Sequence, residues 1–319
     1  MAKNMTRRAW PRGGVRTSLP VTIYRRSSDQ LHPDAQDWIN RVVANGGTVS
    51  SATAGAVNQF CLDLENAPGG SIRDRFYRLN LFSGGTSGTD VGLNSALVPL
   101  YRGPSLGGTQ YGGATDTNQG PFATGAYTEA TGLTLAFASG HYLDTGLTPD
   151  AMPLSVVQAM HLAFSNGPIP AQGVDAYPHL VGAANNPADR HYLGSFQTLT
   201  SGSATLTGQL GKQATTNAAV LVGANPSSSW VLSRTNATSL AIYQNGSLAN
   251  TPNTSSTTGI ASYSRSFFVF KTNFNGSAIG DSIAIPGRHY SIGAGLTGPE
   301  VSSYNSALSS FFSAIGRTA

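Results

Sequence analysis

The sequence predicts a mainly β protein, built on an antiparallel jelly roll or β-sandwich. From residue 80 onward, short runs of alternating apolar and polar residues are separated by Gly, Ser, Thr, Asn and Pro. Candidate strands recur about every 8 to 15 residues, which favours a sandwich over alternating strands and helices. The clearest sample is Ser229–Ala249, where Asn245-Gly246 predicts a tight turn because both residues tolerate positive φ.

The composition limits the kind of protein. Only 11% of the 319 residues are charged and 38 are glycine, which suits a turn-rich β protein better than a solvated disordered chain. No run of 18 apolar residues occurs, so we expect no membrane span, and the N-terminus lacks the apolar core of a signal peptide. The single cysteine, Cys61, excludes a disulfide framework or a cysteine metal site within one chain.

Residues 1–31 predict an extended basic arm. Residues 1–28 carry seven basic residues and no acid, so this segment is +7 and the rest of the chain is 4 − 7 = −3. Arginines interspersed with apolar residues favour docking on another subunit. A disordered basic tail and a nucleic-acid tail are the alternatives, of which nucleic acid is the less favoured. The residues expected to anchor a partner are Arg7, Arg8, Trp10, Arg12, Arg16, Arg25 and Arg26.

Residues 32–75 predict a helical hairpin. Pro33 suits a first helical turn, and Asn45-Gly46-Gly47 ends the first helix. Ser50 or Ser51 can cap a second helix, whose apolar residues recur at i, i+3, i+4 and i+7.

Residues 76–296 predict the jelly roll and 297–319 a C-terminal helix that packs on the body. In the jelly roll we expect residues 83–120 to be mostly loop and Ser155–Phe164, apolar at nearly every residue, to be a central strand. In the final helix, Thr297 and Glu300 stand at the spacing of a capping box, and the apolar residues that follow share one face.

No catalytic, metal or cofactor site is predicted. Glycoside hydrolysis needs two carboxylates about 5 to 10 Å apart, and Glu129 with Asp144 is the only pair that could converge. The six histidines lack metal-ligand spacing, and neither a nucleophile elbow nor a phosphate-binding glycine loop occurs. Glycan binding stays open, because aromatic rings stack on sugar faces. The tyrosines in loop-like contexts that could do this, or could instead cover the sandwich edge, are Tyr101, Tyr111, Tyr177 and Tyr192.

Several short blocks, in order over roughly residues 36–317, resemble structural proteins of tailed bacteriophages. They are Asn45–Thr53, Tyr77–Phe82, Ala96–Leu100, Tyr127–Leu133, Tyr142–Gly146, Tyr290–Leu296 and the ending Ile315–Arg317. The resemblance implies that the middle region is a concanavalin A-like (laminin-G-like) jelly roll. It also implies a virion component, in the capsid, tail or fibre.

We therefore expect a non-enzymatic structural component of a phage particle. The basic arm would bind other virion proteins, and the jelly roll would project, with a capsid-decoration, tail or fibre-attachment role. Apolar anchors in the arm and a surface poor in charge favour a homo-oligomer. The main alternative is a protein that binds a host-surface glycan or receptor, and a glycoside hydrolase or depolymerase is less favoured.

Overall fold

The computed structural model describes residues 30–136, 140–168, 178–186, 189–198, 204–212, 218–222, 227–236, 239–251, 263–281 and 284–317. The chain divides into two units, Met1–Gln30 and Leu31–Ala319. The arm residues proposed as anchors and Tyr177 lie outside the described residues.

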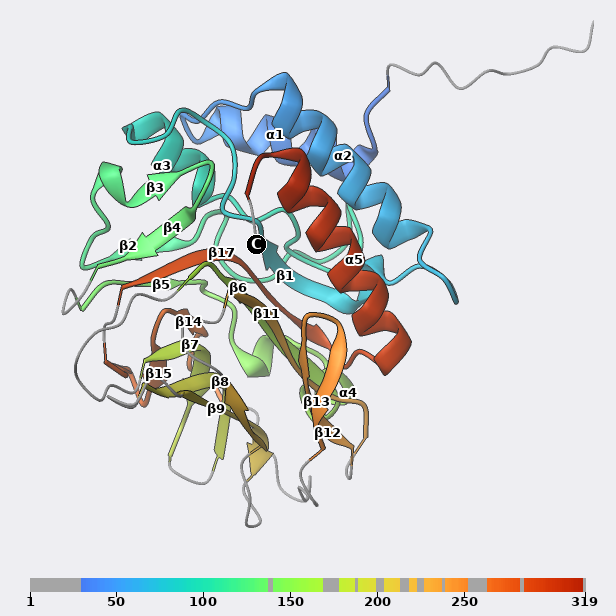
Figure 1. The fold of residues 1–319 in the computed structure, drawn as a ribbon, viewed down its shortest axis with the longest axis vertical. Coiled ribbons are helices and arrows are strands. Elements are labelled where there is room, and N and C mark those ends of the chain that lie inside the picture. Colours follow the sequence, from blue (N-terminus) through green and yellow to red (C-terminus); the bar gives the residue numbers. More distant parts are fainter. Residues whose placement is uncertain are drawn as a thin grey trace, which may run out of the picture. The chain divides into compact units, whose positions relative to one another are not determined.

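The second unit is a sandwich of two sheets, which confirms the predicted fold class (Figure 1). The first sheet has β1 paired with β17 beside the order β13-β12-β11-β6-β17-β4-β3. Its strands are β1 (Phe76–Asn80), β3 (Tyr127–Thr128), β4 (Gly132–Leu135), β6 (Met160–Asn166), β11 (Ser228–Arg234), β12 (Leu240–Gln244), β13 (Ser247–Asn250) and β17 (Ile285–Ala294).

The second sheet has the order β10-β9-β8-β7-β14-β5-β2, and β15 joins it by pairing in parallel with β7. Its strands are β2 (Thr117–Gln119), β5 (Tyr142–Asp144), β7 (His179–Ala184), β8 (Asp189–Thr198), β9 (Ala204–Lys212), β10 (Ala218–Val222), β14 (Phe268–Val269), β15 (Thr272–Phe274) and β16 (Ser277–Ile279).

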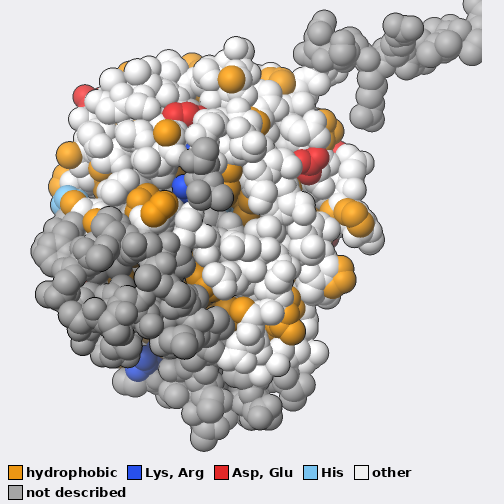
Figure 2. All heavy atoms as spheres, in the orientation of Figure 1, with side chains coloured by type: hydrophobic (Ala, Val, Ile, Leu, Met, Phe, Trp, Pro, Cys, Tyr) orange, Lys and Arg blue, Asp and Glu red, His pale blue; other side chains and the backbone are white. Residues whose placement is uncertain are grey.

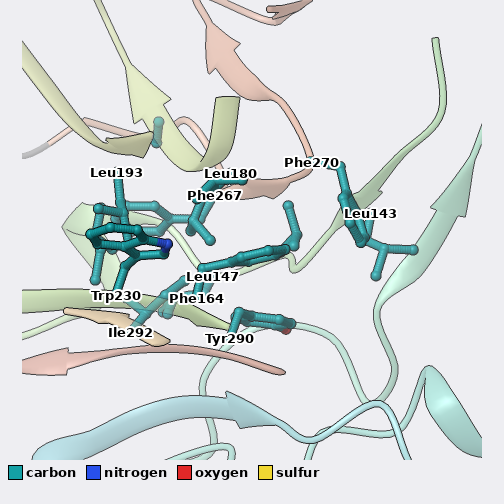
Figure 3. Close-up of a cluster of buried hydrophobic side chains, with 14 of the residues drawn as sticks. Leu143, Leu147, Phe164, Leu180, Leu193, Trp230, Phe267, Phe270, Tyr290 and Ile292 are labelled. Atoms are coloured by element: carbon teal, nitrogen blue, oxygen red, sulfur yellow. The ribbon is translucent and has the colours of Figure 1, made fainter. Parts of the chain in front are cut away.

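The main core lies between the two sheets. Figure 3 shows Trp230, Phe164 and Ile292 of the first sheet facing Leu180 and Leu193 of the second. Burial of such side chains stabilises the folded state by about 1.5 to 3 kcal/mol each, before entropy is counted. Strands β11 and β12 pair with each other, with Trp230 opposite Gln244. The alternation expected along both strands is confirmed, because every second residue of each strand lies in this core.

Helices cover the other face of the first sheet (Figure 1). They are α1 (Pro33–Ala44), α2 (Ser51–Glu65) and α5 (Gly298–Ala314). Trp38, Phe60 and Phe311 from these helices join Val231 of β11 in a second apolar cluster. The first sheet is therefore buried on both faces, and polar side chains on its helix side need partners inside the protein.

Local sequence signals account for the ends of these helices. The Ser50 hydroxyl accepts from the Thr53 amide at 3.1 Å, and the Thr297 amide donates to Glu300 Oε2 at 2.7 Å, as the predicted capping positions require. The turn at Asn245-Gly246 has φ of 50° and 81° and joins β12 to β13.

One prediction about local structure is wrong. Ser155–Phe164 is not one strand, since α4 (Leu154–Gln158) precedes β6. The run is apolar without clear periodicity, and Pro153, at the N-cap of α4, starts a helical turn. Residues 83–120 are mostly loop, as predicted, and they contain two short elements, β2 and α3 (Asp90–Ala96). Helix α3 is capped by the Thr89 side chain, which accepts a hydrogen bond from the Gly92 amide. The remaining short helical turns are η1 (Arg73–Arg75), η2 (Thr124–Ala126) and η3 (Pro149–Ala151).

A buried ion pair ties the loop before β2 to both β1 and β17. Arg78 and Asp116 are fully buried, with Nη2 and Oδ1 2.6 Å apart. Asp116 also accepts from Tyr290 Oη at 2.6 Å and Asn80 Nδ2 at 2.8 Å. Arg78 Nη1 donates to the carbonyls of Tyr111 and Gly113. Each charge is thus surrounded by partners, which is the condition under which a buried pair is tolerated.

Replacing Asp116 with Asn should lower the free energy of unfolding by about 3 to 5 kcal/mol, because Arg78 would stay buried without its counter-charge. The matched control is Asp37→Asn, which removes the partly exposed pair between Asp37 and Arg41 and should cost less than about 1 kcal/mol. Urea unfolding of both variants gives the comparison. Equal losses in the two variants would contradict this account.

Candidate functional site

A cavity of about 380 Å³ lies where α5 meets the ends of β6, β11 and β17. Its size is within the range of small-molecule sites, about 300 to 1,000 Å³. The residues that line it are Ser165, Asn166, Ser227, Ser228, Ser229, Asn245, Arg288, Asn305, Ser309, Phe312, Ser313, Gly316 and Arg317. We call it the α5 pocket.

The α5 pocket is rich in hydroxyl and amide groups. Six of the thirteen described residues that line it are serine and three are asparagine. Phe312 provides an aromatic ring, and the two charged residues among those described are both arginine. These side chains offer many hydrogen-bond donors and acceptors to a polar ligand, together with one apolar surface.

The strand register brings the serines together. Ser229 pairs with Ser165, and Ser228 pairs with Asn166, across the antiparallel β11 and β6. The Asn245 side chain, from the turn after β12, accepts the Ser229 amide at 2.8 Å. Three chain segments that are distant in sequence therefore form one polar wall.

A chain of hydrogen bonds runs from α5 into this wall. Tyr304 Oη lies 2.8 Å from His289 Nε2, and His289 Nδ1 lies 2.7 Å from Ser165 Oγ. Ser165 Oγ in turn lies 2.5 Å from Ser229 Oγ. His289 and Tyr304 are both fully buried, so the chain satisfies polar groups under the helix and fixes the orientation of both serines.

This Ser–His–Tyr chain lacks what a nucleophilic serine requires. Burial, with smaller contributions from His161 and Arg317, lowers the pKa of His289 to about 3, so the imidazole is a weak base. The third member is a tyrosine whose pKa is raised by burial, and no carboxylate stabilises an imidazolium as in a catalytic triad. The geometry favours a fixed binding wall over acyl transfer.

An irregularity in β17 accounts for the position of Arg288. The pairing of β17 with β6 shifts register between Gly287 and His289. An extra residue in a strand changes the direction of the side chains beside it, so Arg288 and His289 can both lie on the helix side of the sheet. Arg288 lines the pocket, with Nη1 donating to Ser227 Oγ at 3.2 Å.

Arg317 holds the end of α5 against the sheet. Its Nε donates to the Glu129 carbonyl at 2.6 Å, and its Nη1 donates to the carbonyls of Leu81 and Arg288 at 2.8 and 2.9 Å. The Phe82 carbonyl accepts a further bond from Nη2. Burial lowers the pKa of Arg317 to about 10, and the guanidinium stays charged at neutral pH.

The structure does not bring the predicted tyrosines together as a sugar-binding surface. Tyr101 and Tyr192 are 1% and 5% exposed, which corrects the expectation that their loop-like sequences leave them at the surface. Tyr101 lies beneath the guanidinium of Arg73, and Tyr192 is on the central strand β8. Tyr111 is half-buried and packs on Tyr77.

Glu129 and Asp144 hold separate structural positions. The Glu129 carboxylate accepts from Thr53 Oγ1 and the Gly84 amide, both at 3.0 Å, and from the Tyr127 hydroxyl. Asp144 is on β5 of the second sheet and accepts the Gly146 amide. Nothing in these contacts resembles a pair of carboxylates across a scissile bond.

Residues that form the α5 pocket were missed because their signal is non-local. Ser165 and Asn166 end an apolar strand, and Ser227–Ser229 begin another, so each looks like a strand terminus in the sequence. The one available sign was the cluster of serines on the exposed side of the predicted C-terminal helix, of which Ser309 and Ser313 line the pocket.

Among the described residues, no group of three or more His, Cys, Asp or Glu side chains could hold a metal ion. None of the helices in these same ranges is long and apolar enough to cross a membrane.

No family model matches the chain, and no curated protein matches it. Solved structures with a similar β-rich arrangement include the binding domain of botulinum neurotoxin serotype D, at 11% identity and a TM-score of 0.45 over 74% of this chain and 52% of that one. The receptor-binding domain of a mosaic serotype C/D neurotoxin is 12% identical, with a TM-score of 0.46 over 74% of this chain and 51% of that one. A structure of botulinum neurotoxin type C, whose cell entry is described as dependent on two ganglioside molecules, is 13% identical, with a TM-score of 0.39 over 55% of this chain and 42% of that one. This chain thus spans about half the length of those proteins or less, and we draw no functional conclusion from similarity at this level.

Acidification should destabilise the protein through its buried histidines. Burial lowers the pKa of His161 to about 4 and of His289 to about 3. Between pH 6.5 and these values the unfolded chain binds more protons than the folded chain. The free energy of unfolding therefore decreases as the pH decreases, by about 1.4 kcal/mol per pH unit for each histidine. His289→Gln, although less stable at pH 7.5, should show a shallower fall.

Urea unfolding at pH 7.5, 6.5, 5.5 and 4.5 measures the two slopes. Below pH 6, the slope of the free energy of unfolding against pH should be steeper in wild type than in His289→Gln by the contribution of about one proton, or about 1.4 kcal/mol per pH unit. Parallel curves would show that His289 is already charged in the folded protein.

Proposed function

We propose that this chain is a non-enzymatic binding protein that recognises a glycan through the α5 pocket. The observation that carries the proposal is the lining, in which nine of the thirteen described residues are serine or asparagine beside the aromatic ring of Phe312. Saccharides present many hydroxyls that both donate and accept, and apolar faces that pack on aromatic rings. Hydroxyl and amide side chains in fixed positions match the first property, and Phe312 matches the second.

The pocket is fixed before a ligand arrives. Ser165 and Ser229 are oriented by the hydrogen-bond chain from Tyr304, and Arg317 anchors the end of α5 to three strands or their flanking loops. A preformed site loses less conformational entropy on binding. Catalysis is disfavoured by the low basicity of His289 and by the structural role of Glu129.

Binding should depend on the side of α5 that faces the pocket. Ser309 and Ser310 are adjacent and both exposed, but Ser309 lines the α5 pocket and Ser310 lies on the side towards α2. Ser309→Trp should fill the mouth of the pocket and weaken glycan binding at least about 10-fold, which corresponds to about 1.4 kcal/mol of binding free energy. Ser310→Trp should leave the affinity for the glycan unchanged.

A glycan array followed by calorimetry on the strongest binder gives the measurement. Equal affinities in the two variants would contradict the site. Absence of binding to every arrayed glycan at high micromolar concentration would contradict the function.

A second candidate role, as a structural component of a virus particle, concerns the basic arm. The +7 charge and apolar anchors of residues 1–28 and the block resemblance to tailed-phage structural proteins favour it. The low proportion of charged residues, 11% of the chain, also suits contact with neighbouring subunits, and Figure 2 shows few charged side chains among the described residues of the face that it presents. In this role the arm binds other virion proteins and the jelly roll carries the pocket outward. Both roles are compatible in one host-attachment component.

Removing residues 1–28 should abolish incorporation into particles without unfolding the body, because the arm and the body are separate units. Complementation of particles with full-length and truncated chains, followed by quantification in purified particles, gives the comparison. Circular dichroism of the truncated chain controls for folding. Normal incorporation of the truncated chain would exclude anchoring through the arm.

A further inference from the structure

The hydrogen-bond chain beneath the α5 pocket extends beyond Tyr304. The Tyr304 hydroxyl bonds not only His289 but also the Ser291 side chain. Ser291 Oγ lies 2.9 Å from His161 Nε2, and His161 Nδ1 lies 2.7 Å from the carbonyl oxygen of Ala294. The chain therefore runs from the wall of the cavity, under α5, to a backbone carbonyl at the end of β17.

Strand register places these groups on one side of the first sheet. His161 and Ser165 are on β6 and His289 and Ser291 are on β17, and within each strand an even number of residues separates the two, so both point to the same face. That face is the one that α5 covers, and all four side chains are at most 1% exposed. Buried polar groups need partners within the protein, so each hydrogen in the chain has to reach an acceptor.

The Ala294 carbonyl gives the chain a direction, because a carbonyl oxygen only accepts hydrogen bonds. His161 Nδ1 must therefore carry the hydrogen of this ring. In a neutral imidazole the other nitrogen is then an acceptor, so Nε2 accepts from the Ser291 hydroxyl. Burial lowers the pKa of His161 to about 4, which keeps the ring neutral at pH 7.

The hydrogens of Tyr304 and His289 are fixed by the one on Ser291. Because the single hydroxyl hydrogen of Ser291 is used on His161, the Tyr304 hydroxyl donates to Ser291. The Tyr304 oxygen can then only accept from His289, whose Nε2 carries the ring hydrogen. Burial raises the pKa of Tyr304 and lowers the pKa of His289 to about 3, so the phenol keeps its proton and the imidazole stays neutral.

The serines of the cavity wall are the last members of the chain. His289 Nδ1 is left as an acceptor, so Ser165 donates to it, and Ser229 then donates to Ser165. We propose that Ser229 presents only lone pairs to the α5 pocket, and that the saccharide bound there meets it with a hydrogen-bond donor, a free hydroxyl or an N–H group. This inference rests on the proposed glycan-binding function and identifies a chemical feature that its ligand must have.

The chain removes the freedom that a serine hydroxyl ordinarily has. An isolated serine can rotate its hydrogen to suit a donor or an acceptor. Ser229 cannot do so without losing its bond to Ser165, and rotation of Ser165 would leave His289 Nδ1 without a donor. A buried acceptor without a partner costs free energy, so the chain resists reversal. A ligand group that only accepts, such as an ether oxygen, therefore meets lone pairs and binds more weakly than a hydroxyl.

The tautomers of the two histidines test the direction of the chain in the intact protein without a ligand. Nitrogen-15 NMR of the histidine-labelled protein at pH 7.5 should show the Nδ1–H form of His161 and the Nε2–H form of His289. Loss of each signal in His161→Gln or His289→Gln gives its assignment. The Nδ1–H form of His289 in the wild-type protein would overturn the proposal.

Ser291→Ala tests whether the direction is transmitted through the chain. This change removes the acceptor of Tyr304, which is then free to donate to His289, so the His289 ring should convert to the Nδ1–H form. The matched control is Ser233→Ala, another buried serine on the helix side of this sheet, whose Oγ bonds backbone groups. Ser233→Ala should leave the tautomer of His289 unchanged. An unchanged tautomer in Ser291→Ala would contradict transmission from the Ala294 carbonyl.

Substituted sugars test the requirement for a donor. The probes are the methyl glycosides of galactose, glucose, mannose and N-acetylglucosamine, each with its monodeoxy and deoxyfluoro analogues. Fluorine cannot donate, so at one ring position of a bound glycoside both analogues should bind at least about 10-fold more weakly in NMR titrations. In Ser291→Ala the wall can donate, and the loss caused by fluorine at that position should shrink at least about 3-fold.

The outcomes separate this inference from the proposed function. Binding that Ser309→Trp blocks but that tolerates fluorine at every position would overturn the donor requirement and leave the glycan site in place. Absence of binding of all four glycosides at about 20 mM would overturn the ligand feature together with the proposed function. The histidine tautomers would in that case still decide the direction of the chain.

Discussion

The buried ion pair between Arg78 and Asp116 is the constraint on which the first sheet and the α5 pocket depend. Its carboxylate holds the hydroxyl of Tyr290, and Tyr290 is two residues beyond Arg288 on β17. Because Tyr290 must reach Asp116, the register of β17 is fixed on the core side. The irregularity at Gly287–His289 then turns Arg288 and His289 to the helix side. An interaction inside the sandwich thereby sets the positions of two residues outside it.

Helix α5 is held at both ends, which makes it a rigid wall. At its start, Glu300 accepts the Thr297 amide and bonds Arg75 beside β1, at 2.9 Å between Nη2 and Oε1. At its end, Arg317 donates to carbonyls of three distant segments. Between these points Tyr304 bonds His289 of the sheet. A wall so constrained cannot collapse into the cavity, so the pocket persists without a ligand at little entropic cost to binding.

The sequence predicts what is locally encoded. Ser50 and Thr297 identify helix starts, Asn245-Gly246 identifies a turn, and alternation along residues 230–243 identifies two strands, all confirmed. The residues of the α5 pocket cannot be predicted in this way, because they come together only in the folded chain. Ser165 and Ser229 are 64 residues apart and meet only through strand pairing, and Asp116 sits in a stretch with no periodicity at all. Tyr101 and Tyr192 were misplaced for the same reason, since burial depends on what packs over a segment rather than on its own composition.

Beneath the α5 pocket, a serine, a histidine and a tyrosine are hydrogen-bonded in a row, and these are residue types from which a hydrolytic site can be made. The burial of the histidine, which lowers its pKa, argues against catalysis. A general base needs a carboxylate to stabilise the imidazolium, and His289 instead faces the hydroxyls of Ser165 and Tyr304, with His161 and Arg317 nearby lowering its pKa further. Burial of His289 therefore disfavours acyl transfer at Ser165, and the hydrogen-bond chain from Tyr304 serves to orient the serine hydroxyls.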